Sequence, residues 1–167
     1  ADVKGLLRTA IRSDDPVLFF EHKRGYEIKV QVPIEEYTIP VGLADVVREG
    51  GDVTVVAISI MRHKAMAAAD ALAAEGIECE VVDPRTLRPL DMSLVLESVR
   101  KTNRCVVVHE HWPYGGPGAE IVDRVQREAF DYLDAPVLKC TGKDVPMPYA
   151  ANLEKLALTS VKEVIDA

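Results

Sequence analysis

The strongest constraint on the fold is an alternation of short apolar runs and helical patterns after residue 52. The apolar runs cover residues 53–58, 77–82, 104–108 and 136–140. They show little of the period-two pattern of a half-exposed strand, so we expect strands that are buried on both faces. Because segments with helical spacing separate them, the connections are predicted to be crossovers. The sequence therefore predicts an α/β fold, with a mainly parallel sheet and helices on both faces.

Local signals place the helices between these strands. Alanines gather on one face of residues 65–73, and Gly76 stands where a helix C-cap is expected. Asp91 is a plausible N-cap for a helix that reaches Val99, and apolar residues at helical spacing fill residues 121–129. Ser160 and Glu163 have the spacing of a capping box, which predicts a last short helix.

The first fifty residues have a different character. Apolar spacing predicts a helix from Val3 to Ile11, followed by a strand at residues 17–20, which would need neighbouring strands. We therefore expect this part to be the end of a larger unit. Residues 21–42 are polar and contain prolines, which favours an extended connector, although residues 30–34 alternate and could form a short strand. A domain boundary is expected near residues 50–51.

Composition excludes some classes of function. A net charge of -7 without clustered Lys or Arg argues against general binding to nucleic acids or anionic membranes. No apolar run approaches the roughly 20 residues of a membrane span, and the N-terminus lacks a signal-peptide pattern. Cys79, Cys105 and Cys140 are far apart and lack metal-ligand spacing. We expect reduced, mostly buried thiols in a reducing compartment, either the cytoplasm or an organelle matrix.

Residues 109–118 invite a functional interpretation. His109 and His111 would point to the same side of a strand, so two metal ligands are possible there, but no third is visible nearby. The glycine-rich turn at residues 115–118 could bind an anion at a helix N-terminus, yet Pro117 removes one amide hydrogen. A packing role for the histidines and a tight turn at the glycines are the favoured interpretations. No Ser-His-Asp, Cys-His or paired-carboxylate arrangement can be assembled.

Several stretches resemble the β subunit of the thiamine-diphosphate-dependent decarboxylating component of 2-oxo acid dehydrogenase complexes. The stretches that carry this resemblance are Glu35–Gly42, Arg48–Gly50, Val82–Asp91, Gly118–Ile121, Leu133–Pro136 and Val145–Ala150. The resemblance covers the whole chain but only about the C-terminal half of such a subunit. It implies that residues 1–50 are the end of a pyrimidine-binding domain with its linker, and that residues 51–167 are a transketolase-type C-terminal domain.

The resemblance also accounts for the missing catalytic constellation. In this family the cofactor lies between α and β subunits, and the β-subunit glutamate that activates the aminopyrimidine belongs to the half that this chain lacks. Thiamine diphosphate and magnesium are therefore expected in the intact enzyme but not on this chain alone, which is predicted to be inactive. In the intact enzyme, oxidative decarboxylation would transfer an acyl group to lipoamide.

Two sites are implied by position. Pyruvate-type members hold a structural potassium ion partly through carbonyls that match Ala10 and Ile11, and through groups at the positions of Ser13 and Asp15. Ser13 stands where the family usually has an acidic residue. Asp134, in the Leu-Asp-Ala-Pro motif, is implied to pair with a basic residue on the peripheral-subunit-binding domain of the dihydrolipoyl acyltransferase. The carboxylate at the C-terminus of the β subunit is implied to share that role.

The resemblance further implies an α subunit and a second β subunit as partners. Residues 145–155 and 101–103 favour a pyruvate-type enzyme, whereas residues 83–86 and 21–23 also resemble acetoin and branched-chain types. Two different hypotheses stay open. One is a stand-alone α/β module that binds a nucleotide or another anion at the glycine turn. The second is the matching domain of a different thiamine enzyme, such as transketolase.

Overall fold

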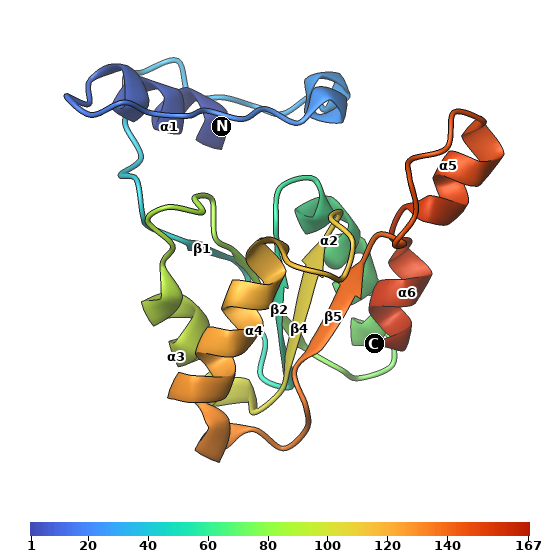
Figure 1. The fold of residues 1–167 in the computed structure, drawn as a ribbon. Coiled ribbons are helices and arrows are strands. Elements are labelled where there is room, and N and C mark those ends of the chain that lie inside the picture. The colour runs from blue at the N-terminus through green and yellow to red at the C-terminus, as the bar shows by residue number, and fades with distance from the viewer.

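In the computed structural model, which describes residues 1–167, a five-stranded sheet has the order β1-β3-β2-β4-β5 (Figure 1). The strands are β1 (Asp45–Arg48), β2 (Val53–Ala57), β3 (Cys79–Asp83), β4 (Cys105–His109) and β5 (Leu138–Thr141). Strands β2 to β5 pair in parallel, and only β1 runs antiparallel, along the outer edge of β3. The expected mainly parallel α/β sheet is therefore confirmed.

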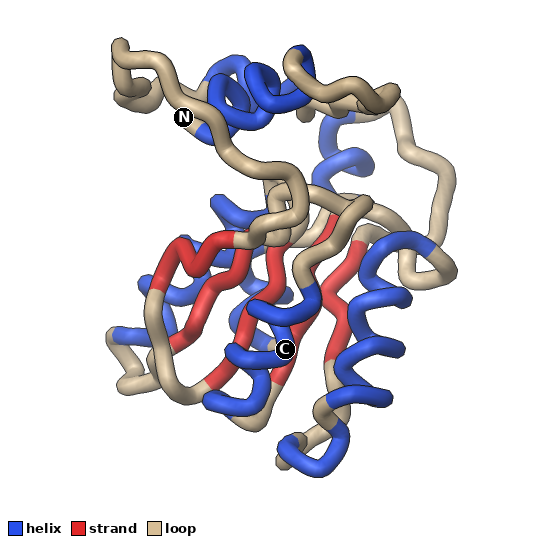
Figure 2. Tube along the Cα trace, turned by 90° about the vertical axis from the view of Figure 1, so that its left-hand side faces the viewer, coloured by secondary structure: helices blue, strands red, loops and turns tan.

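Helices cover both faces of this sheet (Figure 2). Helices α2 (Met61–Ala73) and α6 (Val161–Asp166) pack on one face, and α3 (Met92–Thr102) and α4 (Gly116–Glu128) pack on the other. Outside these layers lie α1 (Asp2–Ile11), α5 (Ala151–Ala157) and two short 3-10 turns at Lys23–Glu27 and Phe130–Tyr132. None of the helices combines the length and apolar character needed to cross a bilayer.

The absence of alternation in the strands follows from this layering. On β2, Val55 packs in the core under α2, and Val56 packs in the core under α3 and α4. Val107 and Val108 divide between the same two cores on β4, and all four valines are almost fully buried. Each buried valine contributes about 1.5–3 kcal/mol relative to an exposed one. Apolar residues are therefore favoured at consecutive positions of these inner strands.

The helix termini form as the sequence predicts. The Asp91 carboxylate accepts a hydrogen bond from the Leu94 amide at 3.3 Å, and Ser160 and Glu163 form both hydrogen bonds of a capping box. Gly76 has a φ of +84°, the left-handed conformation that ends a helix at low cost in a residue without a side chain.

Strand β1 was not expected from the sequence. It is half-buried along its whole length, so its apolar residues show neither a strong alternation nor a continuous buried run. Because β1 pairs with β3, the sheet begins before residue 51, where the sequence analysis places its start. The assignment of residues 1–50 to the end of a preceding domain stays a prediction, with its last residues now part of the sheet.

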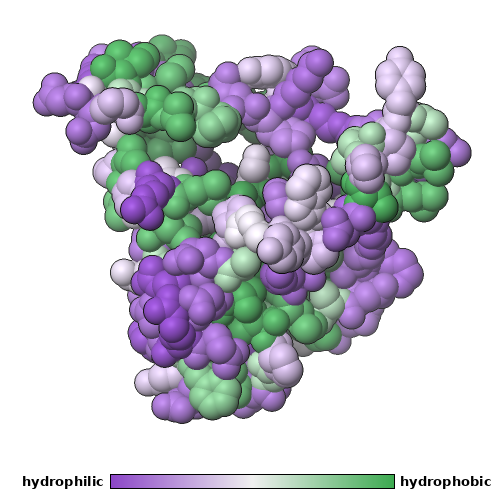
Figure 3. All heavy atoms as spheres, in the orientation of Figure 1, coloured by the Kyte–Doolittle hydropathy of each residue, from purple (hydrophilic) through white to green (hydrophobic).

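The expected strands at residues 17–20 and 30–34 are wrong for this chain, because both stretches are irregular. A strand needs a neighbour to satisfy its backbone, and neither stretch has one here. Leu18, Phe20 and Ile34 are consequently exposed by 85%, 87% and 95%. Figure 3 shows apolar side chains gathered on the N-terminal segment around α1. Helix α5 was not predicted from the sequence.

Candidate functional site

The carboxyl end of β4 carries His109 and His111, the two histidines that the sequence offers as possible metal ligands. His109, at the end of β4, is only 2% exposed, and neither ring nitrogen has a hydrogen-bond partner. Burial lowers its pKa, and the positive charges of His111 and Lys139 lower it further. The neutral imidazole is therefore the favoured form, and it packs as a large buried side chain.

His111 does not complete a metal site with His109. The two rings are tilted, with their centroids 6.3 Å apart, and His111 is exposed with its Nδ1 2.9 Å from the Trp112 carbonyl oxygen. No group of three His, Cys, Asp or Glu residues in the chain is arranged to hold a metal ion. This geometry favours the packing interpretation of the histidine pair.

The glycine turn lets α4 approach β4 closely. Gly115 and Gly116 have φ angles of +66° and +73°, which favour glycine. Gly118 lies in the first turn of α4, where a Cβ would come within 2.2 Å of His109 Nε2. These glycines therefore serve a tight turn and a close helix-to-strand contact.

Polar contacts and ion pairs attach the N-terminal segment to this same edge of the sheet. His22 Nε2 lies 2.8 Å from a Glu110 carboxylate oxygen, and Arg24 lies 2.9 Å from Glu154 on α5. Near the start of α1, Asp2 lies 2.9 Å from Arg62 on α2. The segment is consequently held by charged contacts from separate elements, with its apolar side chains left exposed.

Asp83, at the end of β3, lies within this charged cluster. Burial raises its pKa, although the Arg85 amide and the Arg62 guanidinium favour its charged form. Arg62 lies 3.3 Å from it, and the Arg85 side chain pairs with Asp45 on β1 at 2.7 Å. These partners make the cluster a structural link between α2, β1 and the N-terminal segment.

Another ion pair, with a buried carboxylate and a partly exposed lysine, lies near the amino ends of the strands. The Glu80 side chain is 3% exposed and pairs with Lys101 on α3. Burial opposes the charged form most strongly, but hydrogen bonds from Lys101, Ser98 and the Gly50 amide together hold the pKa of Glu80 below its ordinary value. The pair ties β3 to α3 and the turn before β2.

Asp134 lies at the amino edge of the sheet, opposite the histidines. It precedes β5 and its side chain is 60% exposed, with an oxygen 3.4 Å from the Arg104 guanidinium. Its amide donates a hydrogen bond to the Asn103 carbonyl at 2.9 Å, and the Asn103 side chain donates to the Tyr132 carbonyl at 2.7 Å. The loop is therefore fixed at both ends, while its carboxylate stays available to solvent.

An apolar groove of about 470 Å³ opens beside this loop, between α2, α6 and the amino ends of the strands. Ala135 and Pro136, which follow Asp134, form part of its wall, as do Ile77 and Leu138. Ile77 is 38% exposed and Leu138 is 44% exposed. A carboxylate next to exposed apolar side chains could recognise a partner that presents a basic and an apolar group together.

The residues of the implied potassium loop lie at the C-terminal end of α1. The Ala10 carbonyl accepts a hydrogen bond from the Ser13 amide at 3.2 Å, and the Ser13 hydroxyl accepts one from the Asp15 amide at 3.2 Å. The carbonyl end of a helix favours cations, and carbonyl, hydroxyl and carboxylate oxygens suit a hard cation. The donor set thus fits potassium in chemistry.

Comparison with known protein families identifies the family of this fold. The family model described as "Transketolase, C-terminal domain" matches residues 42–164, from just before β1 into α6. The chain belongs to this transketolase C-terminal domain family. The match includes the entire sheet, and it begins before the start at residue 51 that the sequence analysis expects.

Curated relatives with this transketolase-type domain match the whole chain. The chain is 51% identical to proteins named "Pyruvate dehydrogenase E1 component subunit beta" from Rhizobium meliloti and Rickettsia felis. These alignments cover 100% and 99% of the chain but 36% and 51% of the relatives. It is 47% identical to the mitochondrial "subunit beta-2" of Oryza sativa subsp. japonica, over 99% of the chain and 45% of that relative. The sequence-based recognition is confirmed, and the chain spans about half the length of these relatives or less.

A solved structure supports the same family. It is titled "Split gene transketolase, inactive beta4 tetramer", with a TM-score of 0.68 and 34% identity over 77% of this chain and 42% of that one. The transketolase C-terminal domain fold is thereby confirmed. Sequence reasoning missed the contacts of His22 and Arg24 with the domain, because their partners lie 88 and 130 positions away and no local pattern signals them.

Proposed function

We propose that this chain is the C-terminal part of the β subunit of a thiamine-diphosphate-dependent 2-oxo acid dehydrogenase component. Similarity along the whole chain to proteins named pyruvate dehydrogenase E1 subunit beta supports this assignment and favours pyruvate as the substrate. The intact enzyme would oxidatively decarboxylate the 2-oxo acid and transfer the acyl group to lipoamide. The bacterial and mitochondrial relatives agree with a cytoplasmic or mitochondrial-matrix location.

The proposed task of this half is subunit assembly and docking to the acyltransferase core. The observation that carries the docking role is Asp134, an exposed carboxylate on a fixed loop beside an apolar groove. This site lies at the amino edge of the sheet, away from the edge where parallel sheets usually present their chemistry. A partner could therefore dock here without covering the carboxyl edge.

We expect docking to replace the Arg104 partner of Asp134 with a basic residue of the acyltransferase domain. In the free chain, its guanidinium lies 3.4 Å from Asp134, but both side chains are more than half exposed, so this pair adds little to stability. A basic residue of the peripheral-subunit-binding domain would pair with Asp134 at the interface, where water is excluded. Truncating one member of such a buried charge pair typically costs about 2–5 kcal/mol of binding free energy.

The proposal includes the cofactors of the intact enzyme. When bound between α and β subunits, thiamine diphosphate with magnesium would supply the decarboxylation chemistry, and this chain would contribute contacts to the α subunit and the second β subunit. Alone, the chain is expected to be inactive. Calorimetric titration with thiamine diphosphate and magnesium should show no sub-micromolar binding, and such binding would contradict this part of the proposal.

The potassium loop is proposed on the same basis. Ala10, Ile11, Ser13 and Asp15 would provide part of a coordination shell, and groups outside this chain would complete it. Because Ser13 offers a neutral oxygen where the family usually has an acidic residue, we expect weak binding in the isolated chain. Thermal unfolding in potassium chloride and in matched tetramethylammonium chloride should differ little for the chain alone.

Docking can be measured with the purified peripheral-subunit-binding domain of the cognate acyltransferase. Asp134→Ala should weaken binding by at least about thirtyfold, the low end of the cost of breaking such a pair. Asp144→Ala is the matched control, because Asp144 is exposed on another loop. Arg104→Gln should strengthen binding modestly, since it removes the internal competitor. Equal affinities for the wild-type chain and Asp134→Ala would refute the assignment.

A further inference from the structure

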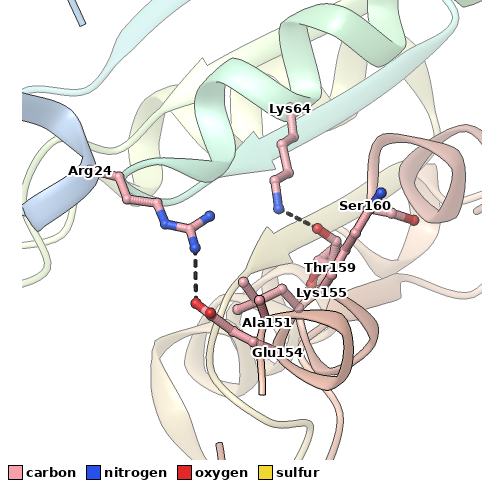
Figure 4. A pocket seen from close by; sticks show the side chains of 8 residues that line it. Arg24, Lys64, Ala151, Glu154, Lys155, Thr159 and Ser160 are labelled. Carbon is pink, nitrogen blue, oxygen red and sulfur yellow. Dashed lines mark hydrogen bonds and ion pairs between the residues drawn. The ribbon is translucent and has the colours of Figure 1, made fainter. Parts of the chain in front are cut away.

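A second cavity, distinct from the groove beside Asp134, lies where the N-terminal segment meets the C-terminal helices (Figure 4). It has a volume of about 460 Å³. The 3-10 turn at residues 23–27 contributes Arg24, α2 contributes Lys64, and α5 contributes Glu154 and Lys155. The lining thus comes from parts of the chain that are far apart in sequence.

Positive charge dominates this cavity. Arg24, Lys64 and Lys155 line it against one carboxylate, that of Glu154. The chain as a whole carries a net charge of -7, so a local excess of cations runs against its overall character. The only apolar lining residues are Ala151 and Leu158. These features favour a small, polar, anionic ligand over an apolar one.

The side chains of Arg24, Lys64 and Lys155 keep hydrogen-bond donors that no group of the chain accepts. Lys64 donates a hydrogen bond to the Thr159 carbonyl, which leaves further donors on its ammonium group. Lys155 forms no ion pair, and Arg24 makes its only ion pair with Glu154, at 2.9 Å. Thr159 also lines the cavity, and its hydroxyl oxygen is buried without a hydrogen-bond partner. The site therefore combines free cationic donors with an unsatisfied hydroxyl group.

We propose that this cavity binds a phosphorylated polar small molecule. The planar guanidinium of Arg24 can donate two parallel hydrogen bonds to phosphate oxygens, while the lysines provide point charges. The volume lies within the range of small-molecule sites and exceeds what a bare phosphate needs. Glu154 is the internal competitor for Arg24, so a bound phosphate would displace that ion pair.

Ligand binding would connect the N-terminal segment to α5. Arg24 belongs to a segment that contacts the rest of the chain through separate polar pairs, whereas Lys64 lies on a helix of the folded core. An anion shared by Arg24, Lys64 and Lys155 would bridge these elements and restrict the segment. Reduced hydrogen exchange at residues 23–27 and 151–157 in the presence of ligand is the expected signature.

Calorimetric titration of the 167-residue chain with inorganic phosphate, pyrophosphate and citrate tests the proposal. We expect saturable binding of the two phosphates that weakens at least about tenfold in Lys64→Gln and in Lys155→Gln, because each loses a charge-assisted contact. Citrate separates a phosphate preference from general attraction of polyanions. Glu154→Gln should tighten phosphate binding, since it frees Arg24.

Lys162→Gln is the matched control, because Lys162 lies on α6 outside the cavity and pairs with Asp166. Circular dichroism spectra establish that each variant is folded. Unchanged phosphate affinity in Lys155→Gln, whose side chain is exposed and unpaired, would overturn the proposal even if Lys64→Gln failed to fold. So would equal affinity for citrate, a loss of affinity in the control, or the absence of saturable phosphate binding.

Discussion

A Cβ atom at Gly118 would lie 2.2 Å from the Nε2 atom of His109, so the first turn of α4 rests directly on a buried imidazole. This contact explains why a glycine in the first turn of α4 faces a histidine at the end of β4. The ring fills the space under the helix, and the missing side chain lets the helix come close. The pair is a packing unit at the edge where a parallel sheet usually carries its functional groups.

Gly118→Ala should destabilise the chain by about 1–3 kcal/mol, because the added methyl group overlaps a side chain that cannot move into solvent. In a His109→Ala background, the same change should be neutral or stabilising, since alanine favours helix by about 1 kcal/mol over glycine. Urea unfolding of the four variants measures this coupling. Gly25→Ala, where an added Cβ meets no atom, is the control. Equal costs in both backgrounds would contradict the contact.

Stability should depend on the protonation of His109. Burial lowers its folded-state pKa below the ordinary value of 6.5, so the unfolded chain binds the proton more readily. The full contribution of the neutral ring is present above about pH 6.5 and is lost as the pH falls below that value. The free energy of unfolding should therefore decline below pH 6.5, and His109→Gln should flatten that decline. His63→Gln, which changes an exposed histidine away from this contact, is the control variant.

The last helix should have a separate acid transition. A hydrogen bond from Lys143, together with the Ser160 amide and hydroxyl, lowers the pKa of Glu163 from 4.5 to about 2. Its contribution is complete above pH 4.5 and is lost as the pH falls toward 2. Ser160→Ala should cost about 0.5–2 kcal/mol, the usual range for a lost N-cap. Glu163→Gln should remove the lower transition in pH-dependent unfolding, and its persistence would exclude this carboxylate as the cause.

The sequence predicted β2, β3 and β4 because these inner strands are buried on both faces and are therefore mostly apolar. Strand β5 lies at the sheet edge and is partly exposed, so its prediction rests on its apolar start and on its place after a helix. Strand β1 escaped detection because it is half-buried and pairs with β3 only at the sheet edge. At residues 17–20 a strand was predicted but does not form. Their apolar character predicts a strand, but the chain supplies no neighbour with which they could pair.

The candidate sites were less accessible to sequence reasoning. Asp134 was reached only through family resemblance, since an exposed aspartate before a strand has no distinctive local pattern. The cavity around Lys64 was not predicted at all, because its lining joins residues 24, 64 and 155 through the folded structure. Such sites depend on long-range packing, whereas helices and strands follow from local spacing.

The most direct test of the docking account is a charge-reversal experiment at Asp134. Asp134→Lys should abolish measurable binding to the peripheral-subunit-binding domain, because it places two positive charges together at the interface. Changing one basic residue of that domain to Glu should restore binding to Asp134→Lys while weakening binding to the wild-type chain. Failure of every such change to restore binding, or undiminished binding by Asp134→Lys itself, would contradict the central claim.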